Sequence, residues 1–207
     1  MRHSSLFTTV RTAIAALLLG GAFLYIASAA ELPLDPKGSS LRFIGETMLH
    51  NFHGEAKEFS GNAELNPQQE PPIQQATLKF TTARMTTFNE GRDKKMYEWL
   101  KVEVHPDATF HLEKVRLTSG DYKAANAQHP ARFAVSGVFT FNGVKQPISG
   151  TATGWREKDR VIVTGETVVD TLKYGLPQVR EAFLTVGTNV RVMYRFAFVL
   201  PADYAAK

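Results

Sequence analysis

A chain of 207 residues without a single cysteine can form no disulfide and carries no cysteine for N-terminal lipid modification. Its 24 basic and 20 acidic residues leave a small positive net charge. The basic residues are scattered and form no stripe interleaved with aromatic residues, which argues against a nucleic-acid partner.

The N-terminal segment has the three parts of a secretory signal peptide. Arg2 and Arg11 supply the positive charge, residues 13–27 are almost entirely apolar, and residues 27–29 are small. We expect cleavage after residue 29, which would leave residues 30–207 as one domain in the periplasm. The alternative is an uncleaved anchor, but a membrane-spanning helix needs about 20 apolar residues and this run is shorter.

From about residue 41 onward, apolar residues recur at every second position in one segment after another. Such alternation is typical of β-strands with one face inside and the other in water. Seven or eight antiparallel strands in one domain favour closure into a barrel, because closure removes exposed edges. Asn142-Gly143 between two such segments is a strong hairpin signal. The alternating apolar residues include Leu41, Phe43, Phe59, Leu78, Phe80, Phe110, Leu112, Phe139, Phe141, Val163, Tyr194, Phe196 and Phe198.

Residues 89–100 break this rhythm and predict a short helix. Met96, Trp99 and Leu100 share one helical face, and Asn89 is a suitable N-terminal cap. We expect this face to plug one end of the barrel, with the ligand entrance at the opposite end.

Two further segments read as loops. Residues 122–131 have no periodic pattern, and residues 173–188 could contain a turn of helix around residues 177–182. Either segment could serve as a gate to the barrel interior.

An eight-stranded barrel has an interior just wide enough for packed side chains or one small ligand. Small residues at inward positions leave space there, although glycines also mark bulges and bends. An interior this apolar favours binding of an apolar molecule over most soluble catalysis. The small inward residues are Gly45, Gly61, Gly137, Gly150, Ala152 and Gly165.

The residues that could support chemistry fit structural roles better. His50 and His53 would point to opposite faces of a strand, which is poor geometry for a metal, and His50 is expected to be a buried histidine bonded to backbone. Arg92 and Asp93 are expected to fix the helix start rather than to catalyse. No Gly-x-Ser-x-Gly elbow, phosphate-binding glycine loop or zinc signature is present. We therefore expect no enzyme activity, no cofactor and no metal.

Six weak motifs occur in order at compatible spacing, and together they make the chain similar to the YceI-like family over residues 34–200. Near the end of the chain, Lys173 precedes Tyr174-Gly175, and Thr171 stands where many members have an arginine. The motifs are 39–43 (SSLRF), 47–54 (TMLHNFHG), 59–61 (FSG), Arg92-Asp93 with Met96, 105–110 (HPDATF) and 135–144 (VSGVFTFNGV).

The resemblance implies an exported carrier with an eight-stranded antiparallel lipocalin-like β-barrel, capped at one end by a short helix. Its apolar cavity would hold a polyisoprenoid or an isoprenoid-quinone-like lipid. Alternatives are an enzyme that acts on a lipid or quinone in the same barrel, and a purely structural or interaction barrel. Transient membrane contact and a homodimer both stay open. The residues predicted to line the cavity are the thirteen alternating residues named above together with Met96 and Trp99.

Overall fold

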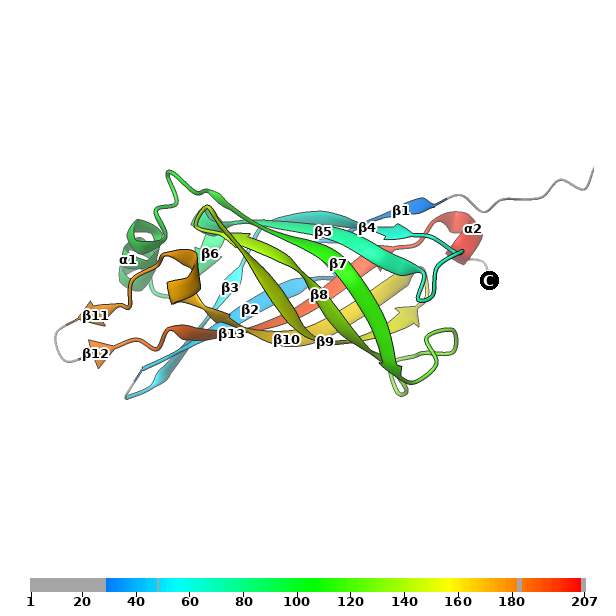
Figure 1. Ribbon diagram of the computed structural model, residues 1–207. Helices are drawn as coiled ribbons and strands as arrows, with labels where there is room; N and C mark the ends of the chain where they lie inside the picture. Colours follow the sequence, from blue (N-terminus) through cyan, green and yellow to red (C-terminus); the bar gives the residue numbers. More distant parts are fainter. Residues whose placement is uncertain (1–28, 48, 182–183, 206–207) are drawn as a thin grey trace, which may run out of the picture.

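The computed structural model describes residues 29–47, 49–181 and 184–205, so the expected signal peptide lies outside the described residues. Eleven strands form one curled antiparallel sheet, and a separate two-stranded hairpin, β11–β12, lies at one end (Figure 1). The strands are β1 (Ala30–Pro33), β2 (Ser40–Glu46), β3 (Asn51–Ala56), β4 (Phe59–Leu65), β5 (Ile73–Thr81), β6 (Met85–Thr86), β7 (Asp107–Ser119), β8 (Ala131–Phe141), β9 (Val144–Glu157), β10 (Arg160–Asp170), β11 (Arg180–Glu181), β12 (Leu184–Thr185) and β13 (Asn189–Val199). The helical segments are η1 (Thr82–Arg84), α1 (Glu90–Leu100), η2 (Thr171–Tyr174) and α2 (Ala202–Ala205).

The all-β class with one short helix at an end is confirmed, but the expected count of eight strands is not. The order in the sheet is β1-β4-β5-β7-β8-β9-β10-β13-β2-β3-β6. The count is higher partly because some long segments are interrupted. Only Lys57 and Glu58 separate β3 from β4, and the single turn η1 separates β5 from β6.

The sheet curls far enough for its edge strand β1 to approach β13. Leu34, which follows β1, forms an isolated antiparallel bridge with Phe198 of β13. Its N–H donates to the carbonyl of Gly61 at 2.9 Å, and the N–H of Asp35 donates to the carbonyl of Ala197 at 2.8 Å. These bonds satisfy backbone groups that an open edge would leave exposed.

The predicted hairpin at residues 142–143 is confirmed. Phe141 ends β8 and Val144 begins β9, so the loop has two residues. Asn142 and Gly143 have φ of 47° and 73°, the left-handed values that a type I′ turn requires at both positions. This turn sets the register that places Phe139 and Phe141 on the inner face.

The helical turn expected around residues 177–182 is wrong for residues 177–181, and residue 182 lies outside the described residues. A turn does occur nearby, but as η2, where the Asp170 carboxylate caps it by accepting from the N–H of Leu172. Gly175 ends the turn with φ of 69°, and the chain then runs extended into β11. The Asp and Gly that bracket residues 171–174 are the local signals that locate the turn.

Several inward glycines make room for aromatic rings. A Cβ atom would collide with a ring at three positions: Phe52 lies over Gly45, Phe43 over Gly54 and Tyr194 over Gly165. At Gly61 and Gly137, and also at Gly54, a Cβ would meet the backbone carbonyl of a neighbouring strand. Gly150 differs, because the nearest atom to its Cβ position lies 3.5 Å away. Of these positions, Gly150 is the one that leaves space as expected.

Candidate functional site

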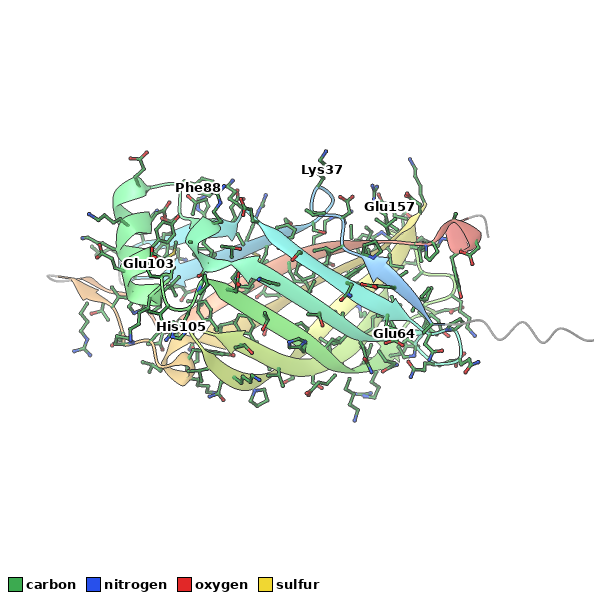
Figure 2. All side chains as sticks on the ribbon, turned by 90° about the horizontal axis from the view of Figure 1, so that it is seen from above. Lys37, Glu64, Phe88, Glu103, His105 and Glu157 are labelled. Atoms are coloured by element: carbon green, nitrogen blue, oxygen red, sulfur yellow. The ribbon has the colours of Figure 1, made fainter. Side chains whose placement is uncertain are left out.

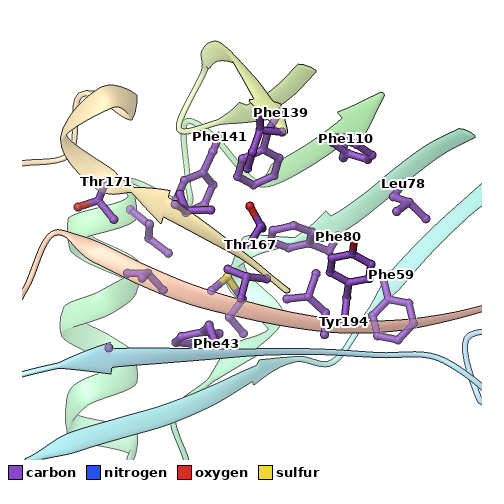
Figure 3. A pocket seen from close by; sticks show the side chains of 18 of the residues that line it. Phe43, Phe59, Leu78, Phe80, Phe110, Phe139, Phe141, Thr167, Thr171 and Tyr194 are labelled. Atoms are coloured by element: carbon purple, nitrogen blue, oxygen red, sulfur yellow. The ribbon is translucent and has the colours of Figure 1, made fainter. Parts of the chain in front are cut away.

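The curled sheet surrounds an apolar cavity of about 710 Å³. Figure 3 shows rings from several strands, including Phe43, Phe80 and Phe139, around this space. The volume lies within the range of small-molecule binding sites. Phe139 packs on Phe80 and Phe141 with ring centroids 6.3 and 5.6 Å apart, which makes the wall rigid as well as apolar.

All the side chains predicted from the sequence to line the cavity lie at its wall. Their placement follows from strand alternation, and their contact with a ligand stays a prediction. They are Leu41, Phe43, Phe59, Leu78, Phe80, Met96, Trp99, Phe110, Leu112, Phe139, Phe141, Val163, Tyr194, Phe196 and Phe198.

Some lining residues were missed by sequence reasoning, and they come mostly from irregular segments. Phe52 lies beside two histidines, which obscured the alternation of its strand. Residues 178–180 and 186–188 line the cavity although this part of the chain has no sustained period. The missed residues include Thr47, His50, Phe52, Thr87, Arg92, Lys95, Gln178, Val179, Arg180 and Val186.

Polar lining residues gather at the α1 end of the cavity, which we call the mouth. Thr47, Arg92, Lys95, Gln178 and Arg180 line the cavity there. At the far end, apolar side chains form a buried cluster instead. This distribution favours an entrance at the α1 end, with the helix beside the mouth, over the entrance expected opposite the helix. The far-end cluster comprises Leu32, Leu34, Ala63, Leu65, Phe196, Phe198 and Leu200.

Arg92 and Asp93 fix the start of α1 as expected, through hydrogen bonds with the preceding residues Thr86 and Thr87. The Asp93 carboxylate accepts from the N–H of Thr87 at 2.7 Å and from both hydroxyls. Arg92 donates from Nε to the Thr87 hydroxyl and from Nη2 to its carbonyl, both at 2.8 Å. Burial raises the pKa of Asp93, but the hydrogen bonds from Thr87 and Thr86 outweigh it and lower the pKa overall.

The predicted helix and its cap are confirmed, since Asn89 Oδ1 accepts from the N–H of Arg92 at 2.9 Å. Of the expected plug residues, Leu100 is fully buried, whereas Trp99 is only partly buried. Trp99 instead joins the two sides of the mouth, because its indole N–H donates to the Pro177 carbonyl at 2.8 Å.

Trp99→Phe should therefore lower the free energy of unfolding by about 1 kcal/mol, the typical net value of one hydrogen bond. The larger loss typical of a fully buried tryptophan does not apply here. Chemical denaturation measures the change, with Glu98→Gln on the exposed face as the control. A loss of about 3 kcal/mol or more, the value typical of a fully buried tryptophan, would contradict the partial burial of Trp99.

His50 and His53 are not placed as a pair of metal ligands would be. His50 is exposed, so its expected burial is wrong, although its backbone is held by Thr47. His53 lies on the outer face, 5.5 Å from the ring of Phe88 between centroids. Within the described residues, no group of three or more His, Asp or Glu side chains could hold a metal ion.

Deep in the cavity, the side chains of Thr167 and Tyr194 place hydroxyl groups in the mostly apolar wall (Figure 3). Burial raises the pKa of Tyr194, so the phenol stays neutral. Its hydroxyl forms no hydrogen bond with any described residue, while its ring stacks on Phe196 at 5.2 Å.

Tyr194→Phe should keep or tighten the binding of a hydrocarbon ligand. A hydroxyl that is buried by a ligand without a partner costs about 1–3 kcal/mol, and phenylalanine removes this cost. Displacement of a fluorescent apolar probe measures the affinity, with the outward Arg195→Gln as the control. Weaker binding of the variant would mean that the ligand carries a polar group at this depth.

The two candidate gates lie at opposite ends. Gln178, Val179 and Thr188, within the segment 173–188, line the cavity at the mouth. In the segment 122–131, Ala125 is buried and its carbonyl accepts from the N–H of Arg156, near the far end. Its position beside the mouth therefore favours the segment 173–188 as the gate.

These features define an all-β protein whose curled antiparallel sheet surrounds an apolar cavity with a polar mouth. The sequence matches the YceI-like domain model over residues 33–198, so the chain belongs to the YceI-like domain family. Among curated proteins, none matches the sequence significantly.

Solved structures show the same fold. BcnA of Burkholderia cenocepacia superposes with a TM-score of 0.65 at 13% identity, covering 79% of this chain and 98% of that chain. A polyisoprenoid-binding domain from Saccharophagus degradans superposes with a TM-score of 0.65 at 16% identity, covering 82% of this chain and 98% of that chain. Among the described residues, neither helix is long and apolar enough to cross a bilayer.

Proposed function

We propose that the protein binds an apolar lipid of the polyisoprenoid type and carries it or sequesters it. The single observation that carries this proposal is a cavity whose wall is mostly apolar in its depth and whose polar lining residues gather mainly at one end. Hydrocarbon gains about 0.8 kcal/mol for each CH₂ removed from water, and the aromatic wall requires no polar partner in return. The polyisoprenoid-binding domain with the same fold supports this ligand class.

The polar end of the lipid would rest at the mouth. The charged side chains there are basic: Arg92, Lys95 and Arg180. Arg92 is held in place by Thr87 and by the Phe52 ring, 4.9 Å from its guanidinium carbon. An oxygen-rich head group would find charged donors at this end, whereas the far end is an apolar cluster with Tyr194 packed against it. Lipids of this kind reside in membranes, so the carrier must meet a membrane to exchange its ligand.

We propose a carrier rather than an enzyme, located in the periplasm after removal of the signal peptide. A phenol whose pKa is raised is a poorer nucleophile or base near neutral pH, and Tyr194 is such a group. The export proposal is supported by the charged, apolar and small-residue pattern of residues 1–29.

Organic extraction of the purified protein, followed by mass spectrometry, tests the ligand. We expect an isoprenoid lipid in near-stoichiometric amount and no change in it after long incubation. A protein that yields no lipid and binds no apolar probe would be a structural barrel instead. Chemical conversion of the extracted lipid would indicate an enzyme. Osmotic-shock release with N-terminal sequencing tests the location, and a membrane-bound chain that keeps its first residues would contradict it.

A further inference from the structure

The exposed apolar side chains of the described chain are distributed very unevenly. Scattered exposed apolar residues are normal, but these lie in the half of the molecule that holds the mouth. Four occur in connecting segments around α1, η2 and the β2–β3 hairpin, which gather at one end in Figure 1. Those four side chains are Leu49, Phe88, Val104 and Leu172, which are 71%, 59%, 69% and 53% exposed. The fifth, Val168, lies on the outer face of strand β10.

Phe88 carries an additional sign of selection for exposure. Its φ is 61°, in the left-handed region that bulky residues rarely occupy and that glycine or asparagine accepts more easily. Figure 2 shows it on the outside of the molecule beside α1. Folding alone would favour a smaller residue here, because the side chain gains little burial and the backbone is strained. An exposed, strained aromatic residue beside a ligand cavity indicates a role in contact with something outside the chain.

Basic side chains accompany these apolar ones. The Lys57 ammonium lies 5.4 Å from the centroid of the Phe88 ring and also pairs with the Glu55 carboxylate. Lys173 is exposed directly after Leu172, and the carbonyl of the exposed Lys101 accepts from the N–H of Val104. Alternating lysine with Phe and Leu is typical of surfaces that lie in the lipid head-group region. Protein interfaces instead have a contiguous core that is depleted in lysine.

We propose that the loops carrying Leu49, Phe88, Val104 and Leu172 dock the mouth onto an anionic phospholipid bilayer. The apolar side chains enter the boundary between head groups and acyl chains, and the lysines meet lipid phosphates. Docking in this orientation places the polar mouth against the surface, so a lipid passes between bilayer and cavity without crossing water. The biological purpose of docking rests on the proposed lipid-carrier function. The evidence for docking is the set of exposed apolar and basic side chains around the mouth.

Flotation with vesicles of phosphatidylethanolamine and phosphatidylglycerol tests the proposal with the purified full-length expression product. We expect binding that weakens in high salt and with phosphatidylcholine vesicles, because the lysine contribution is electrostatic. Leu49→Ser and Val104→Ser should each lower the partition coefficient about three- to tenfold. Val168→Ser removes a side chain of similar exposure from the sheet face and should leave binding unchanged.

Phe88→Asn separates docking from folding. Asparagine tolerates a positive φ, so the variant should be at least as stable to denaturation as the wild type, while its vesicle binding falls. All variants share one N-terminus, so a difference in binding between them reports the substituted side chain. Equal binding by all variants, or an equal loss in Val168→Ser, would overturn the proposal. Absence of vesicle binding by a protein that still yields extractable lipid would overturn docking and leave the proposed function intact.

Discussion

Gly150→Phe should nearly abolish lipid binding while the protein stays folded. The Cβ position of Gly150 lines the cavity and meets no atom closer than 3.5 Å, so the new ring has room to enter the space that a ligand would occupy. Displacing one five-carbon isoprene unit at about 0.8 kcal/mol per carbon costs about 4 kcal/mol, or about a thousandfold in affinity. Organic extraction and probe displacement measure the loss.

Thr151→Phe is the matched control, since its side chain is exposed on the outer face of the same strand. It should retain the lipid content of the wild type. The thermal midpoint of Gly150→Phe should be unchanged or raised, because the ring fills empty apolar volume. Full lipid content in a folded Gly150→Phe protein would show that the ligand does not occupy this part of the cavity.

Asp93→Asn should lower the free energy of unfolding by about 2–3 kcal/mol at neutral pH. The carboxylate accepts hydrogen bonds from Thr86 and Thr87, and an amide leaves some of these donors unpaired in a buried place. Chemical denaturation measures the loss, and Glu90→Gln, exposed in the first turn of the same helix, should change stability little.

The pH dependence of this difference follows from the lowered pKa of Asp93 in the folded state. The carboxylate stabilises the fold fully above its unfolded pKa of about 3.9, and this contribution disappears as the pH falls through the lower folded value. The advantage of the wild type over Asp93→Asn should therefore be constant between about pH 5 and 8 and shrink below about pH 4. A difference that grows on acidification would contradict the role of the ionised carboxylate.

The parts of the fold that follow from local rules could be predicted from the sequence. Strand alternation placed residues such as Phe80 and Phe196 on the inner face, and Asn89 marked the start of α1. The strand count could not be predicted, because the break at Lys57 and Glu58 has no turn signal. The bridge between Leu34 and Phe198 depends on curvature accumulated over the whole sheet.

The wall of the cavity was predictable for the same reason, but its mouth was not. Arg92, Lys95 and Arg180 come from a helix and a short hairpin that tertiary packing brings together. The direction of α1 relative to the sheet decides whether it blocks the cavity or stands beside it. That direction depends on long-range contacts such as the bond from Trp99 to Pro177, which leave no periodic trace in the sequence.

The rings that lie over glycines give the cavity an adjustable length. At Gly45, a single added methyl group would force the ring of Phe52 to swing aside, whereas at Gly54 and Gly165 it would also meet the backbone carbonyls of Thr86 and Thr151. The space that the Phe52 ring leaves or takes lies inside the cavity, and Gly45 and Phe52 are cross-strand partners on β2 and β3. A one-carbon change at Gly45 could therefore retune which lipids fit, so that relatives with the same fold can diverge in ligand size without any change in topology.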